Sequence, residues 1–168
     1  LDGFRLARET AECDGDETRM LIPGGFLSLA ASSVGDDENV TLTSDGKTVV
    51  LKSPFATLKC GLLSGEYVNV AKIIPDTFKT ECLVKRMDVL DALKSAGAIM
   101  GGEKLVRLRI SGHTMTVSGN SEMADYEAEI DCDCRSDAPL NIAFNSEYLR
   151  DALSTIETDE VVMRMDGP

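Results

Sequence analysis

The chain has 168 residues, of which 43% are apolar, and it carries a formal net charge of −12. This length allows one domain or two small ones, and no stretch reaches the run of about 20 apolar residues that a membrane-spanning helix needs. The excess of acidic side chains argues against a free-standing, tight grip on nucleic acid, because such binding draws its free energy from Lys and Arg displacing counterions from phosphates.

Five cysteines are scattered along the chain without the spacing of a disulfide framework: Cys13, Cys60, Cys82, Cys132 and Cys134. An odd number of unpatterned thiols is typical of a protein kept in a reducing compartment. The first residues also lack the basic-then-apolar profile of a signal peptide. We therefore expect reduced cysteines and a cytoplasmic location.

A unit of about 60 residues recurs along the chain, recognisable by the order of its elements more than by sequence identity. The first copy reads as a strand, a helix and three strands, at residues 19–23, 24–34, 39–44, 48–53 and 55–63. Asp45-Gly46 separates two alternating runs, and Gly tolerates the positive φ of a tight hairpin turn. This pair therefore predicts a hairpin.

The same order follows twice more. The second copy predicts elements at residues 81–85, 86–100, 105–110, 114–119 and 125–133, and the third at 140–144, 145–156 and 160–165. The strand-to-helix junctions, marked by Ile22, Val84 and Phe144, lie 62 and 60 positions apart. One architecture is therefore repeated.

Apolar spacing predicts which face of each later helix packs on a sheet. The stripe of the second helix consists of Val89, Leu90, Leu93, Ala96, Gly97 and Met100. Asn145 is a suitable N-cap for the third helix. The stripe of that helix consists of Tyr148, Leu149, Ala152, Leu153 and Ile156.

Residues 126–134 alternate between Tyr, Ala, Ile or Cys on one side and Glu or Asp on the other, as in a strand with one buried and one wet face. Together the elements predict an α+β fold, in which antiparallel sheets carry helices on one face. Pro75 and the polar run through Glu81 make the best domain boundary.

Residues that could carry catalysis form no convincing site. Cys132 and Cys134 with Asp131 and Asp133 offer metal-binding donors, but they lack a second ligand pair, and on a strand the thiols face away from the carboxylates. His113 follows a turn glycine and has no nucleophile pattern beside it. Residues 101–104, "GGEK", follow a helix and read as its C-cap and loop. We expect neither an enzyme nor a bound metal or cofactor.

Three segments carry a resemblance to a known family: "LDGFRLA" at residues 1–7, "LLSGEYVNVAKIIP" at 62–75 and "LNIAFNSEYLRDAL" at 140–153. The chain resembles the bacterial sliding clamp, the beta subunit of DNA polymerase III. The resemblance implies the DNA-clamp fold, with three domains per subunit, each made of two such units, and a head-to-tail homodimer ring around duplex DNA.

In that plan residues 1–78 belong to the middle domain, with 1–7 as the closing strand of its first half. Residues 79–168 resemble the third domain without its last strands, so a partial chain is expected. The function implied is that of a processivity clamp, a non-catalytic subunit that tethers its polymerase by topology.

The resemblance also implies sites. A pocket for short peptides of the polymerase III catalytic subunit, the clamp loader and other partners would use Gly3, Phe4, Arg5, Leu6, Val68, Lys72 and Ile73. Val68 stands where the family usually has proline, and Lys72 where arginine is common. Lys85, Arg86 and Lys94 would face DNA, and Ile99 and Met100 would lie at the ring interface.

Two other readings remain open from the residues themselves. The first is a repeat-built protein-interaction module with no DNA role, for which helices of near-zero net charge would be natural. The second is a small hydrolase that uses Asp131 and Asp133.

Overall fold

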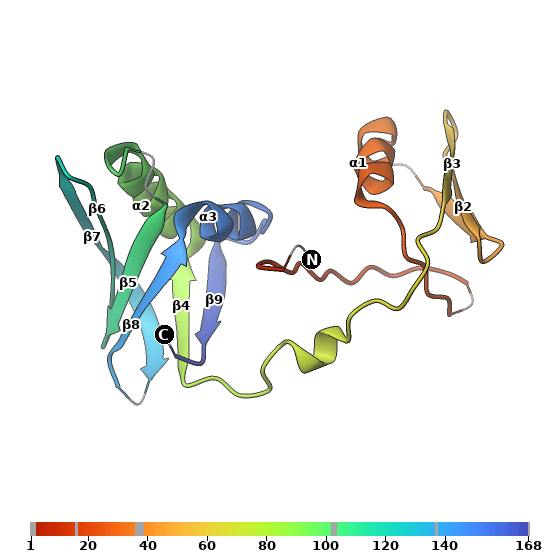
Figure 1. Ribbon diagram of the computed structural model, residues 1–168. Helices are drawn as coiled ribbons and strands as arrows, with labels where there is room; N and C mark the ends of the chain where they lie inside the picture. The colour runs from red at the N-terminus through yellow and green to blue at the C-terminus, as the bar shows by residue number, and fades with distance from the viewer. Residues whose placement is uncertain (1–2, 16, 36–38, 102–103, 137, 168) are drawn as a thin grey trace. The chain divides into compact units, whose positions relative to one another are not determined.

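The computed structural model describes residues 3–15, 17–35, 39–101, 104–136 and 138–167 (Figure 1). The chain divides into two compact units. The larger unit comprises Leu1–Glu9 and Ala71–Pro168, and the smaller unit comprises Thr10–Val70.

The larger unit is built around one six-stranded antiparallel sheet. Its elements in chain order are β4 (Thr80–Lys85), α2 (Arg86–Ile99), β5 (Leu105–Ser111), β6 (Thr114–Asn120), β7 (Asp125–Ser136), β8 (Leu140–Asn145), α3 (Ser146–Ser154) and β9 (Glu160–Met165). The strand order is β8-β5-β6-β7-β4-β9. The predicted strand-helix-three-strand order is therefore present from β4 to β7, and it begins again at β8.

The two successive copies are joined by exchanging strand partners. β4, the first strand of one copy, pairs with β9 of the next, with Thr80 opposite Met165. β8, the first strand of the later copy, pairs with β5 of the earlier one, with Leu105 opposite Asn145. The two copies therefore share a single sheet, in which each copy pairs its first strand with a strand of the other in an approximately two-fold arrangement.

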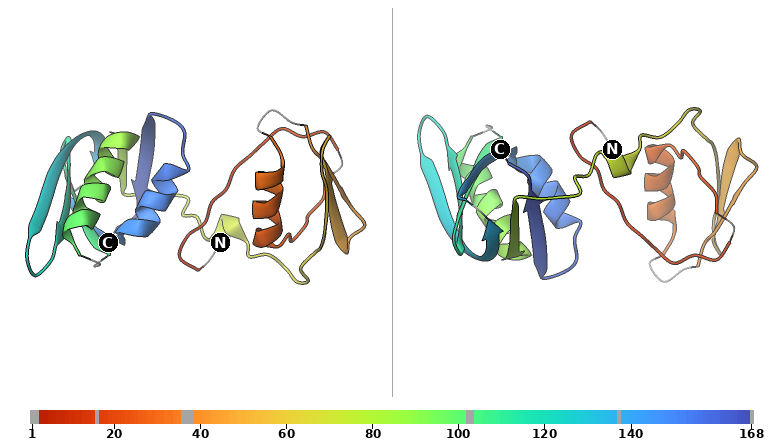
Figure 2. Two further views of the ribbon diagram at one scale, coloured as in Figure 1. Left: turned by 90° about the horizontal axis from the view of Figure 1, so that it is seen from above. Right: turned by 90° about the horizontal axis from the view of Figure 1, so that it is seen from below.

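Helices α2 and α3 lie side by side against one face of this sheet (Figures 1 and 2). Between helices and sheet lies an apolar core that includes Val84, Val89, Leu93, Val106, Leu108, Ile110, Met115, Val117 and Leu153. The α+β fold with helices on one face of an antiparallel sheet is confirmed.

The buried stripe of α2 follows the helical period, with two corrections to the sequence prediction. Val89, Leu93, Ala96 and Met100 are buried as expected, but Gly97 is exposed and Ala92 is buried. Positions three and four residues apart share a helix face, so Ala92, between Val89 and Ala96, continues the stripe. Gly97 lies on the edge of the stripe, on the side of the half-buried Leu90, and is left exposed.

The stripe predicted for α3 is only partly correct. Leu153 is buried and Tyr148 and Leu149 are half-buried, but Ala152 and Ile156 are exposed. The helix ends at Ser154, so Ile156 lies beyond it. The predicted cap is confirmed, because the Asn145 side chain accepts a hydrogen bond of 3.0 Å from the backbone N–H of Glu147.

The smaller unit packs α1 (Gly24–Ser33) on a three-stranded antiparallel sheet. Its strands are β1 (Thr41–Ser44), β2 (Thr48–Lys52) and β3 (Thr57–Gly61), in that order. Its core consists of Phe26, Ala30, Val49 and Leu51. A short 3-10 helix, η1 (Val70–Lys72), follows at the junction with the larger unit.

Two predicted strands do not form among the described residues. Residues 19–23 are extended, and Leu21 accepts a backbone hydrogen bond of 2.8 Å from Leu63, but they form no ladder within the described chain. Residues 3–7, predicted as the closing strand of a half-domain, are likewise outside any sheet, and residues 1–2 lie outside the described part. A strand needs a neighbouring strand about 4.8 Å away to bond with, and the described residues supply none here.

The hairpin predicted at Asp45-Gly46 joins β1 to β2. Gly46 has a φ of +81°, which glycine adopts without strain. The Asp45 carboxylate accepts hydrogen bonds from Lys47 N–H (2.9 Å), Thr48 N–H (2.6 Å) and the Thr48 hydroxyl (2.9 Å). These donors, the backbone N–H of Thr48 first, lower the pKa of Asp45 to about 2.

We predict that Asp45 stabilises this turn only where it is ionised. Because its folded pKa is lowered, its contribution is complete above the unfolded pKa of about 3.9 and is lost as the pH falls through about 2. In the full-length protein, Asp45→Ala should lower the melting temperature at pH 7, and the difference from wild type should shrink between pH 4 and 2. Asp45→Asn keeps an acceptor without the charge and is the control. A difference that is constant with pH would contradict the assignment.

A second prediction concerns the close approach of α2 to β6. A Cβ on Gly119 would lie 2.6 Å from Sδ of Met100, whose side chain is 1% exposed. Gly119→Ala should therefore lower the free energy of unfolding by about 1–3 kcal/mol, the usual cost of overpacking a core. Gly97 lies on α2, and a Cβ there would meet no other atom, so Gly97→Ala should raise the free energy of unfolding by about 0.5–1 kcal/mol. Thermal or denaturant unfolding measures both, and equal effects would refute the packing argument.

Candidate functional site

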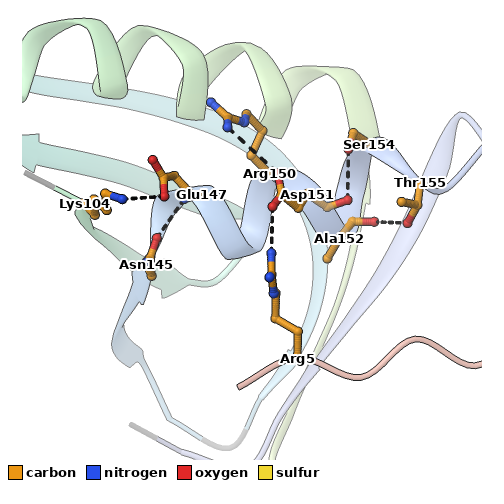
Figure 3. Close-up of polar contacts among 9 residues, drawn as sticks. All are labelled: Arg5, Lys104, Asn145, Glu147, Arg150, Asp151, Ala152, Ser154 and Thr155. Carbon is orange, nitrogen blue, oxygen red and sulfur yellow. Dashed lines mark hydrogen bonds and ion pairs between the residues drawn. The ribbon is translucent and has the colours of Figure 1, made fainter. Parts of the chain in front are cut away.

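The first described residues lie against the outer side of α3, within the larger unit (Figure 3). Nη1 of Arg5 is 2.8 Å from Oδ2 of Asp151, and the guanidinium lies 4.6 Å from the centroid of the Tyr148 ring. The ring of Phe4 is 5.7 Å from that of Tyr148, centroid to centroid. A short segment of the opening sequence is therefore docked on a helix more than 140 positions further along the chain.

The geometry of α3 follows from its cap and its buried line. Asn145 caps the helix, and Ser146, Leu149 and Leu153 turn toward the sheet. Because helical neighbours are separated by about 100°, Tyr148 and Asp151 point away from the sheet toward the docked segment, as Figure 3 shows for Asp151. The sequence thus presents an aromatic ring and a carboxylate together.

A second ion pair holds the first turn of α3 to the start of β5. Nζ of Lys104 is 2.7 Å from Oε2 of Glu147 (Figure 3), and the backbone N–H of Ser146 donates to the Lys104 carbonyl at 2.7 Å. The hydrogen bond that Lys104 donates to Glu147 raises the pKa of Lys104 and lowers the pKa of Glu147. Each charge stabilises the other, so the first turn of α3 is tied to the start of β5.

The predicted pocket residues occupy different parts of the structure. Phe4 is 80% exposed and Leu6 is half-buried, while Gly3 has a φ of +93°. In the larger unit Lys72 and Ile73 are also exposed. Val68 is exposed and belongs to the smaller unit.

Sequence reasoning missed the two α3 residues that Phe4 and Arg5 contact. Tyr148 had been assigned to a buried stripe, and Asp151 had no assignment. The opposite charges of Arg5 and Asp151 are the one signal available, but they are 146 positions apart, and no local pattern pairs them.

The residues predicted to face DNA differ in their exposure to solvent and in their hydrogen bonds. Lys85 and Lys94 are exposed. Arg86 is half-buried, and its Nε donates to the Thr158 carbonyl at 2.8 Å, while its backbone N–H donates to the Asp159 carbonyl at 2.8 Å. Arg86 therefore fastens the start of α2 to the loop before β9.

The two predicted ring-interface residues lie at the end of α2. Ile99 is half-buried and presents part of its side chain to solvent. Met100 is 1% exposed and packs against the position of Gly119, so its side chain belongs to the core of the unit.

The other chemical candidates behave as structural residues. Asp131 and Asp133 are exposed on the face of β7 opposite to the buried Cys132, and exposed His113 lies in the turn between β5 and β6. Among the described residues, no group of three or more His, Cys, Asp and Glu side chains is arranged to hold a metal ion. Gly101, with a φ of +60°, follows α2 as a C-terminal glycine does, and residues 102–103 lie outside the described chain. No described helix is long and apolar enough to cross a membrane.

Comparison with known proteins identifies the class. The larger unit, with two strand-helix copies sharing one sheet, is a clamp-type domain: residues 71–168 match the family described as "DNA polymerase III beta subunit, C-terminal domain". This match spans more than half of the chain. The chain belongs to the DNA polymerase III beta-subunit family.

Individual relatives agree with this assignment. The chain is 25% identical to the beta sliding clamp of Staphylococcus epidermidis over 99% of its own length and 46% of that protein. It is 27% identical to the DNA polymerase sliding clamp from Bacillus subtilis, with a TM-score of 0.82, over 88% of this chain and 40% of that one. The fold is also that of the DNA polymerase III beta chain from Streptococcus pneumoniae, with a TM-score of 0.84 at 22% identity, over 95% of this chain and 43% of that one. The chain spans less than half the length of these relatives.

The docked segment makes a testable prediction. An ion pair as exposed as that between Arg5 and Asp151 is worth up to about 1 kcal/mol. In the full-length protein, Asp151→Ala should therefore speed tryptic cleavage after Arg5 by up to about fivefold. Ser154→Ala is the matched control, because the Ser154 hydroxyl bonds to a carbonyl of its own helix. Equal cleavage rates in wild type and Asp151→Ala would show that the pair does not hold the segment.

Proposed function

We propose that this chain is part of a replication processivity clamp, a ring-forming subunit that encircles duplex DNA and tethers DNA polymerase III. The observation that carries the proposal is the family match over residues 71–168, together with a larger unit whose two helices share one sheet face. The beta sliding clamps among its relatives carry this role in their name. Such a subunit works in the cytoplasm and catalyses no reaction itself.

In the intact protein, residues 1–78 would belong to the middle domain and residues 79–168 to the third. The ring would be a homodimer. Ile99, partly open at the end of α2, would contact the neighbouring subunit, with Met100 supporting it from the core.

Topological tethering suits the charge of this chain. A ring closed around DNA does not depend on displacing many counterions, so a net charge of −12 is compatible with it. The acidic excess is carried by strands and loops, because α2 has two basic and two acidic residues and α3 has one basic and two acidic. The helical face would therefore meet phosphates through the exposed Lys94, with Lys85 beside it at the N-cap of α2 and Arg86 serving mainly as a structural tie.

The peptide-binding pocket of the proposed clamp would lie beside the docked segment. Gly3 and Leu6 continue the segment whose Phe4 and Arg5 rest on α3, and Lys72 and Ile73 are exposed in the same unit. Val68, the remaining residue that the resemblance implies, belongs to the smaller unit. A small apolar surface flanked by a few polar anchors suits a short linear peptide, here one from the polymerase III catalytic subunit, the clamp loader or another partner.

The alternative of an interaction module without a DNA role is not favoured. The near-zero net charge of the helices first suggested it, but the family match over the larger unit points to a clamp.

A primer-extension assay on circular single-stranded DNA, with the full-length protein, its polymerase and clamp loader, tests the proposal. Lys85→Glu/Lys94→Glu should shorten the products several-fold, because two exposed cations, one at the N-cap of α2 and one on α2, become acidic. Lys52→Glu/Lys59→Glu, which changes the same charge on exposed strand positions, is the control and should leave product length unchanged. Wild-type protein that fails to lengthen the products would refute the clamp role, whereas equal effects of both variants would remove Lys85 and Lys94 from the DNA-facing surface.

A further inference from the structure

The strongest chemistry outside the proposed clamp sites is a group of three cysteines on neighbouring strands. Cys82 lies on β4, and Cys132 and Cys134 lie on β7 with their side chains on the same, core-facing side of the sheet. The Sγ atoms of Cys82 and Cys134 are 2.7 Å apart. This is closer than two sulfurs pack without bonding and longer than the roughly 2.05 Å of a disulfide.

We propose that Cys82 and Cys134 are an oxidation site, a thiol pair that peroxide converts into a reversible disulfide between β4 and β7. The proposal concerns the chemistry of the larger unit and does not rest on the clamp role.

The strand register places the two residues correctly for this bond. Cys82 and Cys134 are directly opposite each other in the antiparallel β4–β7 pair. Directly opposed residues of such a pair have Cα atoms about 4.5 or 5.5 Å apart, and disulfides span about 4.4–6.8 Å. The bond can therefore close by side-chain rotation, without moving either strand.

The third cysteine is less suitable. Cys132 is opposite Val84, which lies two residues after Cys82 on β4, so Cys132 and Cys82 are diagonal neighbours in the β4–β7 pair. Its neighbour on the same strand, Cys134, is two residues away, about 6.6–6.8 Å along the strand, at the far limit for a disulfide. The register therefore selects the 82–134 pair over the other two.

Access to the pair is from one side. Cys134 is half-buried and lines a cleft of about 190 Å³, together with Ser111, Gly112, Ser136 and Pro139 from the adjoining strand ends and turns. Cys82 is 0% exposed, and burial raises the pKa of its thiol. Cys134 is thus the thiol that an oxidant reaches first, and Cys82 is the partner that resolves the product.

The reaction balances with hydrogen peroxide as the oxidant. The Cys134 thiolate attacks one peroxide oxygen, the O–O bond breaks, and hydroxide leaves with the Cys134 proton as water, giving a sulfenic acid. The Cys82 sulfur then attacks that sulfur, the S–O bond breaks, and the leaving hydroxide takes the Cys82 proton as a second water. Two thiols and one peroxide become one disulfide and two waters.

Mass spectrometry of the full-length protein tests the proposal. After treatment with hydrogen peroxide and trypsin, the peptide of residues 80–85 should be linked to that of residues 110–135, and dithiothreitol should separate them. Trypsin leaves Cys132 and Cys134 on one peptide, so Cys132→Ala is needed to assign the bond. Cys132→Ala should keep the link, and Cys134→Ala, a matched change on the same face of the same strand, should abolish it.

Each other outcome overturns the proposal. A link that persists in Cys134→Ala would assign the bond to Cys132. A peptide 80–85 that stays unlinked while Cys134 is oxidised to sulfinic acid would show that the pair does not close. In the wild-type protein, additional cleavage by Asp-N before Asp133 separates Cys132 from Cys134 and assigns the bond without a variant, so a folding defect in either substitution leaves the test intact. The assay uses neither DNA nor polymerase, so its result is separate from that of the clamp proposal.

Discussion

Pairing between strands of successive copies is the constraint on which the larger unit depends. β4 lies between β7 of its own copy and β9 of the next, while β8 pairs with β5 of the preceding copy. Neither copy alone covers both edges of its first strand. Because each helix follows that first strand directly, the exchange also brings α2 and α3 side by side over one core. The sheet, the core and the helical face are therefore consequences of one pairing scheme.

Local periodicity predicted most of the helices and strands, because their sequence patterns depend on residues close together in the chain. Alternation along β7 and the cap at Asn145 are short-range patterns, and both are correct. Residues 19–23 were wrongly assigned to a strand, because an extended apolar run becomes a strand only if another strand lies beside it. Gly97 was wrongly assigned to the buried stripe of α2 for a related reason. Apolar spacing shows which side of a helix is buried, but the packing partner decides which residues at the edge of that side are covered.

The candidate site shows the same limit more sharply. The sequence identified the segment from Gly3 to Leu6 as exposed and available for binding, through its resemblance to a family. It could not show that Arg5 and Phe4 rest on α3, because that contact depends on tertiary structure across most of the chain.

The two faces of the larger unit also differ in charge. The outer side of β7 presents exposed acidic residues, whereas the helices are nearly neutral.

The position of β4 also governs the order in which this polypeptide becomes structured. Thr80 pairs with Met165, near the far end of the described chain, and Arg86 bonds to the loop just before that strand. During synthesis β4 and α2 emerge long before β9, and closing so long a loop carries an entropic cost. Contacts between distant positions slow folding, so the edge of β4 that pairs with β9 stays unpaired until β9 is available. On the ribosome, this edge of β4 would therefore stay open to other strands until β9 is made.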